Sequence, residues 1–249
     1  MADVVLLSND SIWFYVGKAR ILESSGNSFN GLFSAVPESF DDPFGHIIAV
    51  PESSVVLNIV LHAIYDLSCT KYNPPFDAIA EAISVLKTYG VPLHTRLSAG
   101  SSLFSLLMSY APVVPLDLYT LAASYDLHDL AAFASQYLHS LSLASLSDGE
   151  AERMGAVYVK RLFFLHYGRI NALKRILLAP PVPHTPIAQC NFVDQKNLTR
   201  AWALASASLA WDVTPGKSED LHGIMFGGSL WNLRYLRWRY RVRLCSARE

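Results

Sequence analysis

Alternation between apolar and polar positions divides the first 50 residues into short strands and short helical turns. Two β-rich runs at 3–7 and 12–16 flank a polar turn at 8–11, which predicts a β-hairpin. Two short helical turns are expected next, because apolar anchors recur at one-turn spacing in Phe29, Leu32 and Phe33. After a loop rich in Pro, Ser, Asp and Gly at 37–45, the apolar run at 46–50 predicts a third strand.

Helical periodicity begins after Pro51. One apolar face predicts a helix capped by Ser53 or Ser54, and its members are Val56, Val60, Ala63, Ile64 and Leu67. Two similar helical units follow, and the first helix of each ends at a tyrosine corner, at 89–91 and at 125–127. Because Tyr89 and Tyr125 are 36 positions apart (125 − 89) and each corner precedes a partner helix, we expect a repeated helical hairpin.

The last third of the chain is also predicted to be largely helical. A turn and cap at 147–150 precedes a long helix at about 152–178, with an expected break at Gly168 and an inward face of Leu162, Leu165, Leu173 and Ile176. Four prolines at 180–186 predict an extended linker. A further amphipathic helix is expected beyond it, with an apolar face of Leu198, Ala201, Trp202, Ala205 and Leu209.

Together these elements predict an α+β fold. A small mixed sheet from the first 50 residues is covered by helices, and an all-α helical extension follows. The expected segments are a first domain with helical hairpins, a helical extension, a Pro-rich linker, and a C-terminal helix with a basic tail, at 1–145, 146–178, 179–187 and 188–249.

Composition adds an expectation about partners. Hydrophobic residues make up 51% of the 249-residue chain and charged residues only 16%, below the roughly 25% typical of soluble domains. Such a chain can bury a large core, and we expect it to bury some surface against a partner as well. The net charge is −1, so no global electrostatic attraction to nucleic acid or to a membrane is implied.

Cysteine usage and the N-terminal residues indicate where in the cell the chain is expected. Three widely spaced cysteines without a Cys-x-x-Cys pattern argue against a disulfide framework and a zinc site, and the N-terminal residues lack a secretory signal. The uncharged stretch 97–116 has the length of a membrane span, but Gly100, five serines and two prolines interrupt it, which favours a buried helix and a turn. We expect a cytoplasmic or nuclear protein, or one found in both places.

Motifs for catalysis are missing from the sequence. It contains no Gly-x-Ser-x-Gly elbow, no P-loop and no Gly-x-Gly-x-x-Gly fingerprint, and its eight histidines form no His-x-x-x-His pair. We therefore predict a protein that is not an enzyme and has no catalytic residues, cofactor or metal. A hydrolase is an alternative, because a triad is recognised by geometry; it would need a deep pocket with a nucleophile hydrogen-bonded to a histidine.

Strict alternation returns at 236–244, where apolar residues alternate with Arg237, Arg239, Arg241 and Arg243. If extended, this tail would have one apolar face and one cationic face. It supports a second hypothesis, a nucleic-acid-associated regulator that binds phosphate groups with a basic and aromatic arm. The alternatives are an edge strand, a disordered end, or a tail altered by an error in the gene prediction, each without a binding role.

The N-terminal residues resemble the start of a BTB/POZ domain, in particular that of fungal BTB-domain proteins. The family pattern has Asp-Val, then Phe-x-x-His-Lys, then Leu and Phe at fixed spacings, and the matching residues are Asp3, Val4, Phe14, Lys18, Leu22 and Phe29. Gly17 stands where the family usually has His, and Gly26 where it usually has a helix-capping Ser. The resemblance is clear over the first third of the chain and looser to about Ala210.

This resemblance implies homo- or hetero-oligomerisation through the N-terminal domain, with the chain itself, another BTB protein or an adaptor as partner. In that family the first strand and first helices form much of the dimer surface. By position that surface would include Val4, Leu6, Trp13, Tyr15, Ile21, Leu22, Phe29 and Leu32. Alternation along each strand allows only about half of such residues to face a partner. Cullin-type ubiquitin-ligase adaptors are one branch of the family, but no specific motif for cullin contact is found.

Overall fold

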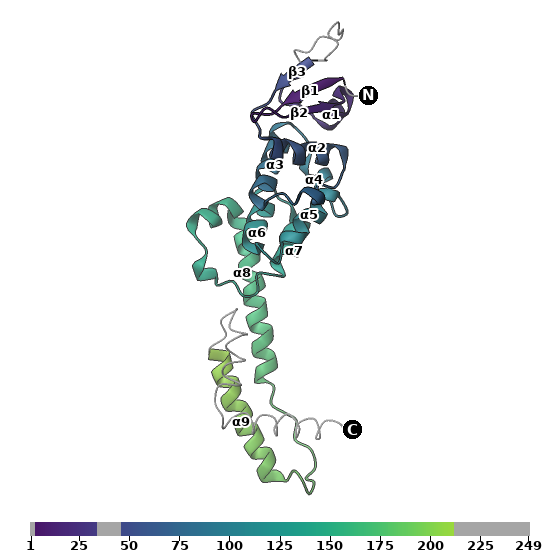
Figure 1. Cartoon of the computed structure of the whole chain (residues 1–249). Helices are drawn as coiled ribbons and strands as arrows, with labels where there is room; N and C mark the ends of the chain where they lie inside the picture. The colour runs from purple at the N-terminus through teal and green to yellow at the C-terminus, as the bar shows by residue number, and fades with distance from the viewer. Residues whose placement is uncertain (1–2, 34–45, 212–249) are drawn as a thin grey trace. The chain divides into compact units, whose positions relative to one another are not determined.

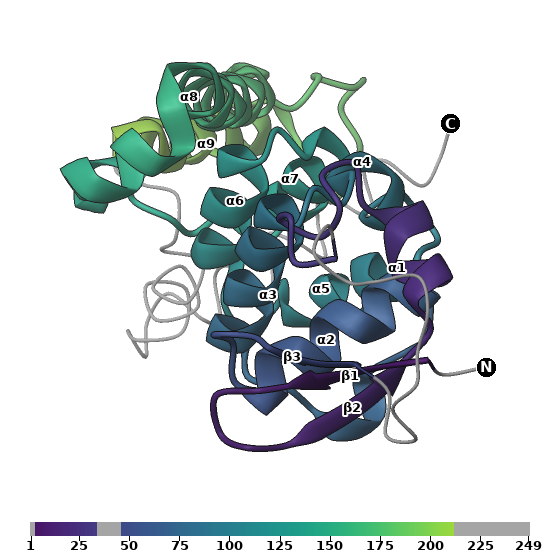
Figure 2. The same cartoon turned by 90° about the horizontal axis from the view of Figure 1, so that it is seen from above.

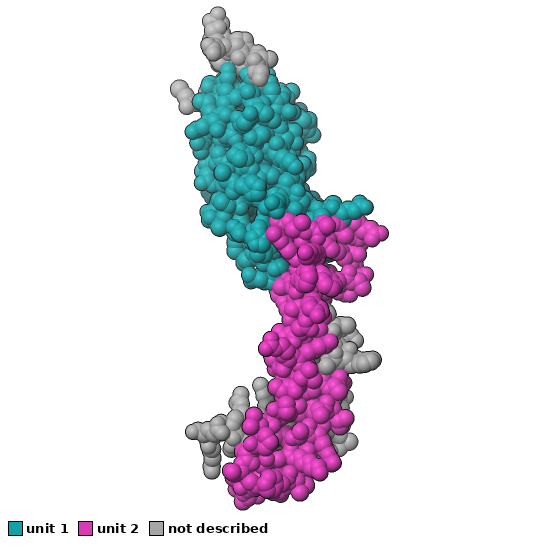
Figure 3. Space-filling view, turned by 180° about the vertical axis from the view of Figure 1, so that it is seen from behind, with its two compact units in different colours: residues 1–138, 152–155 teal, residues 139–151, 156–249 magenta. Residues whose placement is uncertain are grey.

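The computed structural model describes residues 3–33 and 46–211. The predicted loop at 37–45 and the arginine tail at 237–243 lie outside these residues. The strand predicted after the loop lies within them. The chain divides into two compact units (Figure 3). Unit 1 comprises Met1–Leu138 with Glu152–Gly155, and unit 2 comprises His139–Ala151 with Ala156–Glu249. The finer division of the sequence at 145, 178 and 187 stays a prediction.

A small mixed sheet forms within the first 50 residues (Figure 1). Its strands are β1 (Val4–Leu7), β2 (Trp13–Val16) and β3 (His46–Ala49), in the order β2-β1-β3. β1 and β2 pair antiparallel as the predicted hairpin, whereas β1 and β3 pair parallel. The predicted α+β class, with a small mixed sheet and mostly helices, is therefore confirmed.

The inner face of the sheet belongs to the core of unit 1. Because side chains alternate along strands, this face carries the buried residues Val4, Leu6, Val16 and Ile48. The sheet lies against helix α2 (Ser54–Tyr65) (Figure 2). Seven of the twelve residues of α2 are buried: Val56, Leu57, Ile59, Val60, Leu61, Ala63 and Ile64.

The bounds of α2 follow the predicted signals with one correction. Ser53 caps the helix, since its side chain accepts a hydrogen bond from the backbone N–H of Val56. The helix ends at Tyr65, and Asp66 adopts a left-handed conformation with φ 55°. Leu67 therefore leaves the apolar face on which it was predicted, and it is 56% exposed.

The segment after β2 contains one helix, α1 (Lys18–Ser24), instead of two helical turns. The second expected helical turn is left-handed and not right-handed, because Ser28, Phe29 and Asn30 have φ between 55° and 57° and Gly31 has φ 76°. Left-handed backbone costs roughly 1–2 kcal/mol for each non-glycine residue. Burial of Phe29, whose ring stacks on Tyr89 at a centroid distance of 3.8 Å, offsets part of this cost.

Unit 1 continues as a series of helices: η1 (Thr70–Tyr72), α3 (Phe76–Thr88), α4 (Leu93–Arg96), α5 (Ser102–Tyr110), α6 (Pro115–Ser124) and α7 (His128–Ser135). The two tyrosine corners end α3 and α6 in the same way. The N–H of Val91 donates to Leu86 O at 2.9 Å, and the N–H of Leu127 donates to Ala122 O at 2.8 Å. Gly90 and Asp126 take the left-handed position of these helix ends.

The uncharged stretch 97–116 is divided between α5 and the beginning of α6. Ser101 caps α5 by accepting a hydrogen bond from the N–H of Phe104, and Pro115 is the first residue of α6. Within residues 3–33 and 46–211, no helix combines the length and apolar character needed to cross a membrane.

Unit 2 contains the short helix η2 (Leu143–Ser145), most of α8 (Asp148–Leu178) and α9 (Phe192–Trp211). The predicted cap of α8 is a capping box, in which Ser147 and Glu150 bond reciprocally. The Nε1–H of Trp202 donates to Leu177 O at 3.0 Å, which ties α9 to the end of α8. Of the predicted inward residues of α8, Leu162 is buried, but Leu173 and Ile176 are exposed.

The break in the long helix lies at Gly155 and not at the predicted Gly168. Gly155 has φ 73° and ψ 158°, and two helices meet there within α8. This region of backbone conformation is essentially restricted to glycine. The sequence offered two glycines, and helical propensity alone does not distinguish them.

Candidate protein-interaction surface

The side of the sheet opposite the core carries an uncharged, largely apolar set of side chains. We call Val5, Leu7, Trp13, Tyr15, Ile47 and Ala49 the outer sheet face. The strand register sets them beside one another: Val5 lies between Tyr15 and Ile47, and Leu7 lies between Trp13 and Ala49. The central Val5 is buried, whereas Trp13, Tyr15 and Ile47 are 51%, 71% and 46% exposed.

The structure brings together only part of the interface predicted from the sequence. Trp13 and Tyr15 lie on the outer sheet face, as an interface requires. Val4, Leu6 and Phe29 are buried in the core of unit 1, and so is Ile21. Leu22 and Leu32 are partly buried. Buried side chains cannot contact a partner without unfolding, so the first strand does not contribute its inward residues to a surface.

Ile47 is a member of the outer sheet face that the sequence interpretation did not select. The run at 46–50 was predicted to be a strand, and alternation within it would have separated Ile47 from Ile48. The sequence did not show which strand β3 pairs with. Only the parallel register of β3 with β1 places Ile47 next to Val5 and across from Tyr15.

The hairpin turn that supports this face is fixed by Asp10. Its carboxylate accepts hydrogen bonds from Ser54 N at 2.8 Å, Ser54 Oγ at 2.6 Å and Ser8 Oγ at 2.6 Å. The bond from the Ser54 side chain, followed by that from Ser8, lowers the pKa of Asp10 from 3.8 to about 2. The turn is thereby tied to the beginning of α2, and β2 is held in place.

A second tie joins the segment after α1 to the corner that ends α3. Gly26 N donates to Gly90 O at 2.9 Å, and the Asn27 side chain donates to Thr88 O at 2.9 Å. The Ser25 hydroxyl donates to Tyr89 O at 2.6 Å. Burial, together with the hydrogen bond that the Tyr89 hydroxyl donates to Glu52, raises the pKa of Tyr89.

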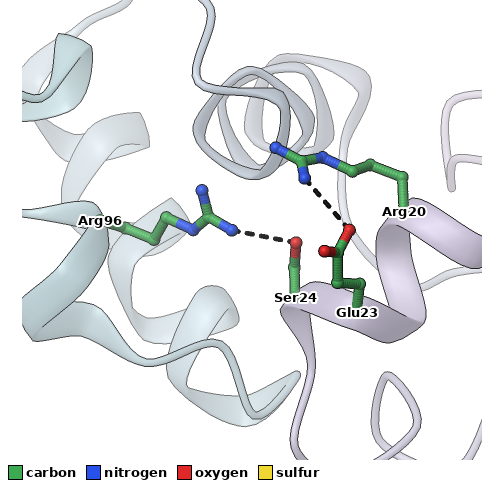
Figure 4. Close-up of polar contacts among 4 residues, drawn as sticks. All are labelled: Arg20, Glu23, Ser24 and Arg96. Atoms are coloured by element: carbon green, nitrogen blue, oxygen red, sulfur yellow. Dashed lines mark hydrogen bonds and ion pairs between the residues drawn. The ribbon is translucent and has the colours of Figure 1, made fainter.

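Polar side chains of α1 and α4 also meet (Figure 4). Arg96 Nη2 donates to Ser24 Oγ at 3.0 Å, and Arg20 forms an ion pair with Glu23 at 3.2 Å. The ion pair is exposed, and such pairs contribute roughly 0–1 kcal/mol to stability. We interpret this group as a structural connection between two short helices.

A second exposed apolar stripe lies on α8 in unit 2, and the sequence interpretation assigned it no role. It consists of Val157, Phe163, Phe164 and Tyr167, which recur at helical spacing and are all more than half exposed. The Phe163 and Tyr167 rings stack at 6.2 Å, and Lys160 Nζ lies 6.0 Å from the Phe164 ring centroid. The recurrence of aromatic residues at 163, 164 and 167 was the signal in the sequence.

Neither a metal site nor the predicted arginine arm is found among the described residues. Among the residues that the structure describes, no group of three or more His, Cys, Asp or Glu side chains is placed to hold a metal ion. Arg237, Arg239, Arg241 and Arg243 lie outside the described residues. Comparison of the chain with protein-family models, with curated proteins and with solved structures finds no match in any of the three.

Proposed function

We propose that this chain is a non-enzymatic protein-interaction module that associates with a second copy of itself through the outer sheet face. The observation that carries the proposal is the exposure of Trp13, Tyr15 and Ile47 around the central Val5 on one uncharged face. An exposed apolar patch of this kind is typical of an interaction site.

The composition of the face favours a strong contact for its size. Trp and Tyr are the residues most enriched among interface positions whose truncation weakens binding, and each aromatic side chain can bury 150–250 Å². A standard interface buries about 800 Å² on each partner, so further residues such as the exposed Ile12, which precedes Trp13, would have to take part.

A second copy is the partner that best fits these properties. The six residues of the outer sheet face include no charge, so the face offers no electrostatic selection for an acidic or basic partner. Around a two-fold axis the same patch is used twice, which lets one apolar patch cover another. The resemblance to BTB/POZ domains supports dimerisation in general, although the proposed contact uses β2 and β3 and not the inward residues of β1. Service as an adaptor would require a further partner.

The proposal is tested by the solution mass of the full chain with one charge added to the face. Tyr15→Glu places two like charges in a two-fold contact and should convert a dimer into a monomer without loss of helical content. Val113→Glu is the matched control, because Val113 is exposed on the turn between α5 and α6 and lies outside the sheet. A Tyr15→Glu variant that associates as strongly as Val113→Glu would exclude this surface.

A further inference from the structure

Helix α8 carries two polar side chains, one turn apart, with buried nitrogen atoms that have no hydrogen-bond partner among the described residues. His166 is 2% exposed, and neither of its ring nitrogens has a partner within the described part of the chain. Arg169 Nη1 is also buried without a partner there. Residues three apart on a helix are neighbours on its surface, so the two groups form one cluster.

Unpartnered donors of this kind are costly in the interior of a protein. Most buried polar atoms in folded proteins have a hydrogen-bond partner, and a guanidinium keeps its charge at any physiological pH. The neutral imidazole of His166 carries one N–H donor, and its protonated form carries two. The cluster therefore presents donors from two side chains and calls for an acceptor.

The surroundings of the cluster favour a negatively charged acceptor. Burial lowers the pKa of His166 below its usual value, and the charges of Arg169 on α8 and of His139, which precedes η2, act in the same direction. The part of α8 at 156–178 contains five basic residues, Lys160, Arg161, Arg169, Lys174 and Arg175, and no Asp or Glu. A cation here has no acidic neighbour on its own helix.

We propose that His166 and Arg169, with His139 beside them, form a binding site for a small oxyanion, either a phosphate or a carboxylate group. The planar guanidinium of Arg169 matches the two oxygens of either group. Protonated His166 would donate a further charge-assisted hydrogen bond. Arg169 is partly buried whereas His166 is 2% exposed, so the arginine side chain is the more accessible of the two.

The test follows the side-chain NMR signals of His166 in the full chain during separate titrations with inorganic phosphate and with acetate, each matched by sodium chloride at equal ionic strength. A bound anion favours the imidazolium, so the pKa of His166 should rise on saturation, opposite to the effect of its present neighbours. A shift with phosphate alone would indicate a phosphate-bearing ligand. Shifts with both anions would indicate that a carboxylate also suffices.

Arg169→Gln should weaken anion binding at least about tenfold, because a charge-assisted hydrogen bond is lost. Arg175→Gln is the control, since it removes the same charge from an exposed position on the same helix. Arg169→Lys keeps the charge without the planar fork and should give an intermediate affinity. The melting temperature of the unmodified chain should also rise with phosphate.

Two results would overturn the proposal. The first is a His166 pKa that responds to phosphate and acetate no more than to chloride. The second is equal anion affinity in the Arg169→Gln and Arg175→Gln variants. Because both readouts belong to α8, they do not depend on whether the outer sheet face mediates association.

Discussion

Gly90 shows how one residue fixes the position of the segment after α1. Its φ is +70°, and a Cβ built on it would lie 2.6 Å from Asn27 Cγ and Oδ1. Asn27 in turn bonds the backbone of Thr88 and of Asn30. A side chain at position 90 would therefore both strain the corner and displace Asn27 from these bonds.

We predict that Gly90→Ala lowers the free energy of unfolding by about 2–4 kcal/mol, from left-handed strain together with lost packing. Gly31→Ala separates the two causes, because Gly31 has φ +76° but a Cβ there would meet nothing within 4 Å. Its cost should be about 1–2 kcal/mol, from backbone strain alone. Urea denaturation measures both, and equal losses for the two variants would refute the role assigned to Asn27.

Asp10 gives a prediction about acid stability. Its pKa is lowered from 3.8 to about 2 in the folded chain, so the ionised form stabilises the fold fully above pH 4. That contribution is lost as the pH falls from about 4 to about 2. In Asp10→Asn, which cannot ionise, the decline in stability over this window should be shallower. Denaturation midpoints measured at several pH values give the dependence of stability on pH for each protein. An identical dependence in Asp10→Asn and the unmodified chain would contradict the role of the Asp10 carboxylate in holding the hairpin turn.

At the residue scale, capping was the feature most visible in the sequence. Ser53 was one of two proposed caps and is the one used, and the turn at 147–150 is a capping box, because Ser and Glu side chains bond nearby backbone N–H groups. The left-handed turn at Phe29 had no such local signal. Its conformation is set by stacking on Tyr89, a residue 60 positions away (89 − 29).

The position of the break in α8 depends on which of two glycines interrupts the helix, and helical propensity is the same for both. Gly155 occupies a conformation that other residues avoid, whereas Gly168 lies in the regular helix. A Cβ at Gly168 would meet nothing within 4 Å. The two positions should therefore respond to the same substitution with opposite signs.

We predict that Gly155→Ala destabilises the chain by about 1–3 kcal/mol. Gly168→Ala should stabilise it by about 0.4–1 kcal/mol, because alanine has less freedom to lose on folding. Thermal melts of the two variants, followed by circular dichroism, give the comparison. A destabilised Gly168→Ala variant with a neutral Gly155→Ala variant would place the break at the position predicted from the sequence.

Element types were predictable where periodicity was strong, and element faces were less so. The hairpin, the third strand, α2 and the repeated corners follow from apolar spacing and turn residues. The buried and exposed faces of α8 were not predicted correctly. Leu173 and Ile176, expected to face inward, are exposed, and Phe163 and Tyr167 belong to the exposed aromatic stripe. An amphipathic pattern predicts a buried face only where another element covers it.

At the scale of the whole molecule, the proposed self-association would give one explanation for both the low charge content and the exposed apolar sheet face. The sequence interpretation selected Trp13 and Tyr15 but also Val4, Leu6 and Phe29, which the core contains. Position in a family pattern could not show which of these residues are exposed and which are buried. Their separation depends on which sheet face α2 covers, and that depends on tertiary packing.

The most direct test of the account is light scattering on the full chain over a dilution series. We predict a mass near 55 kDa, twice the 27.6 kDa of one chain, that persists to low micromolar concentration. The Tyr15→Glu variant should have the mass of a single chain at the same concentrations, and Val113→Glu should behave as the unmodified chain does. A single-chain mass for the unmodified protein at every concentration would contradict self-association through the outer sheet face.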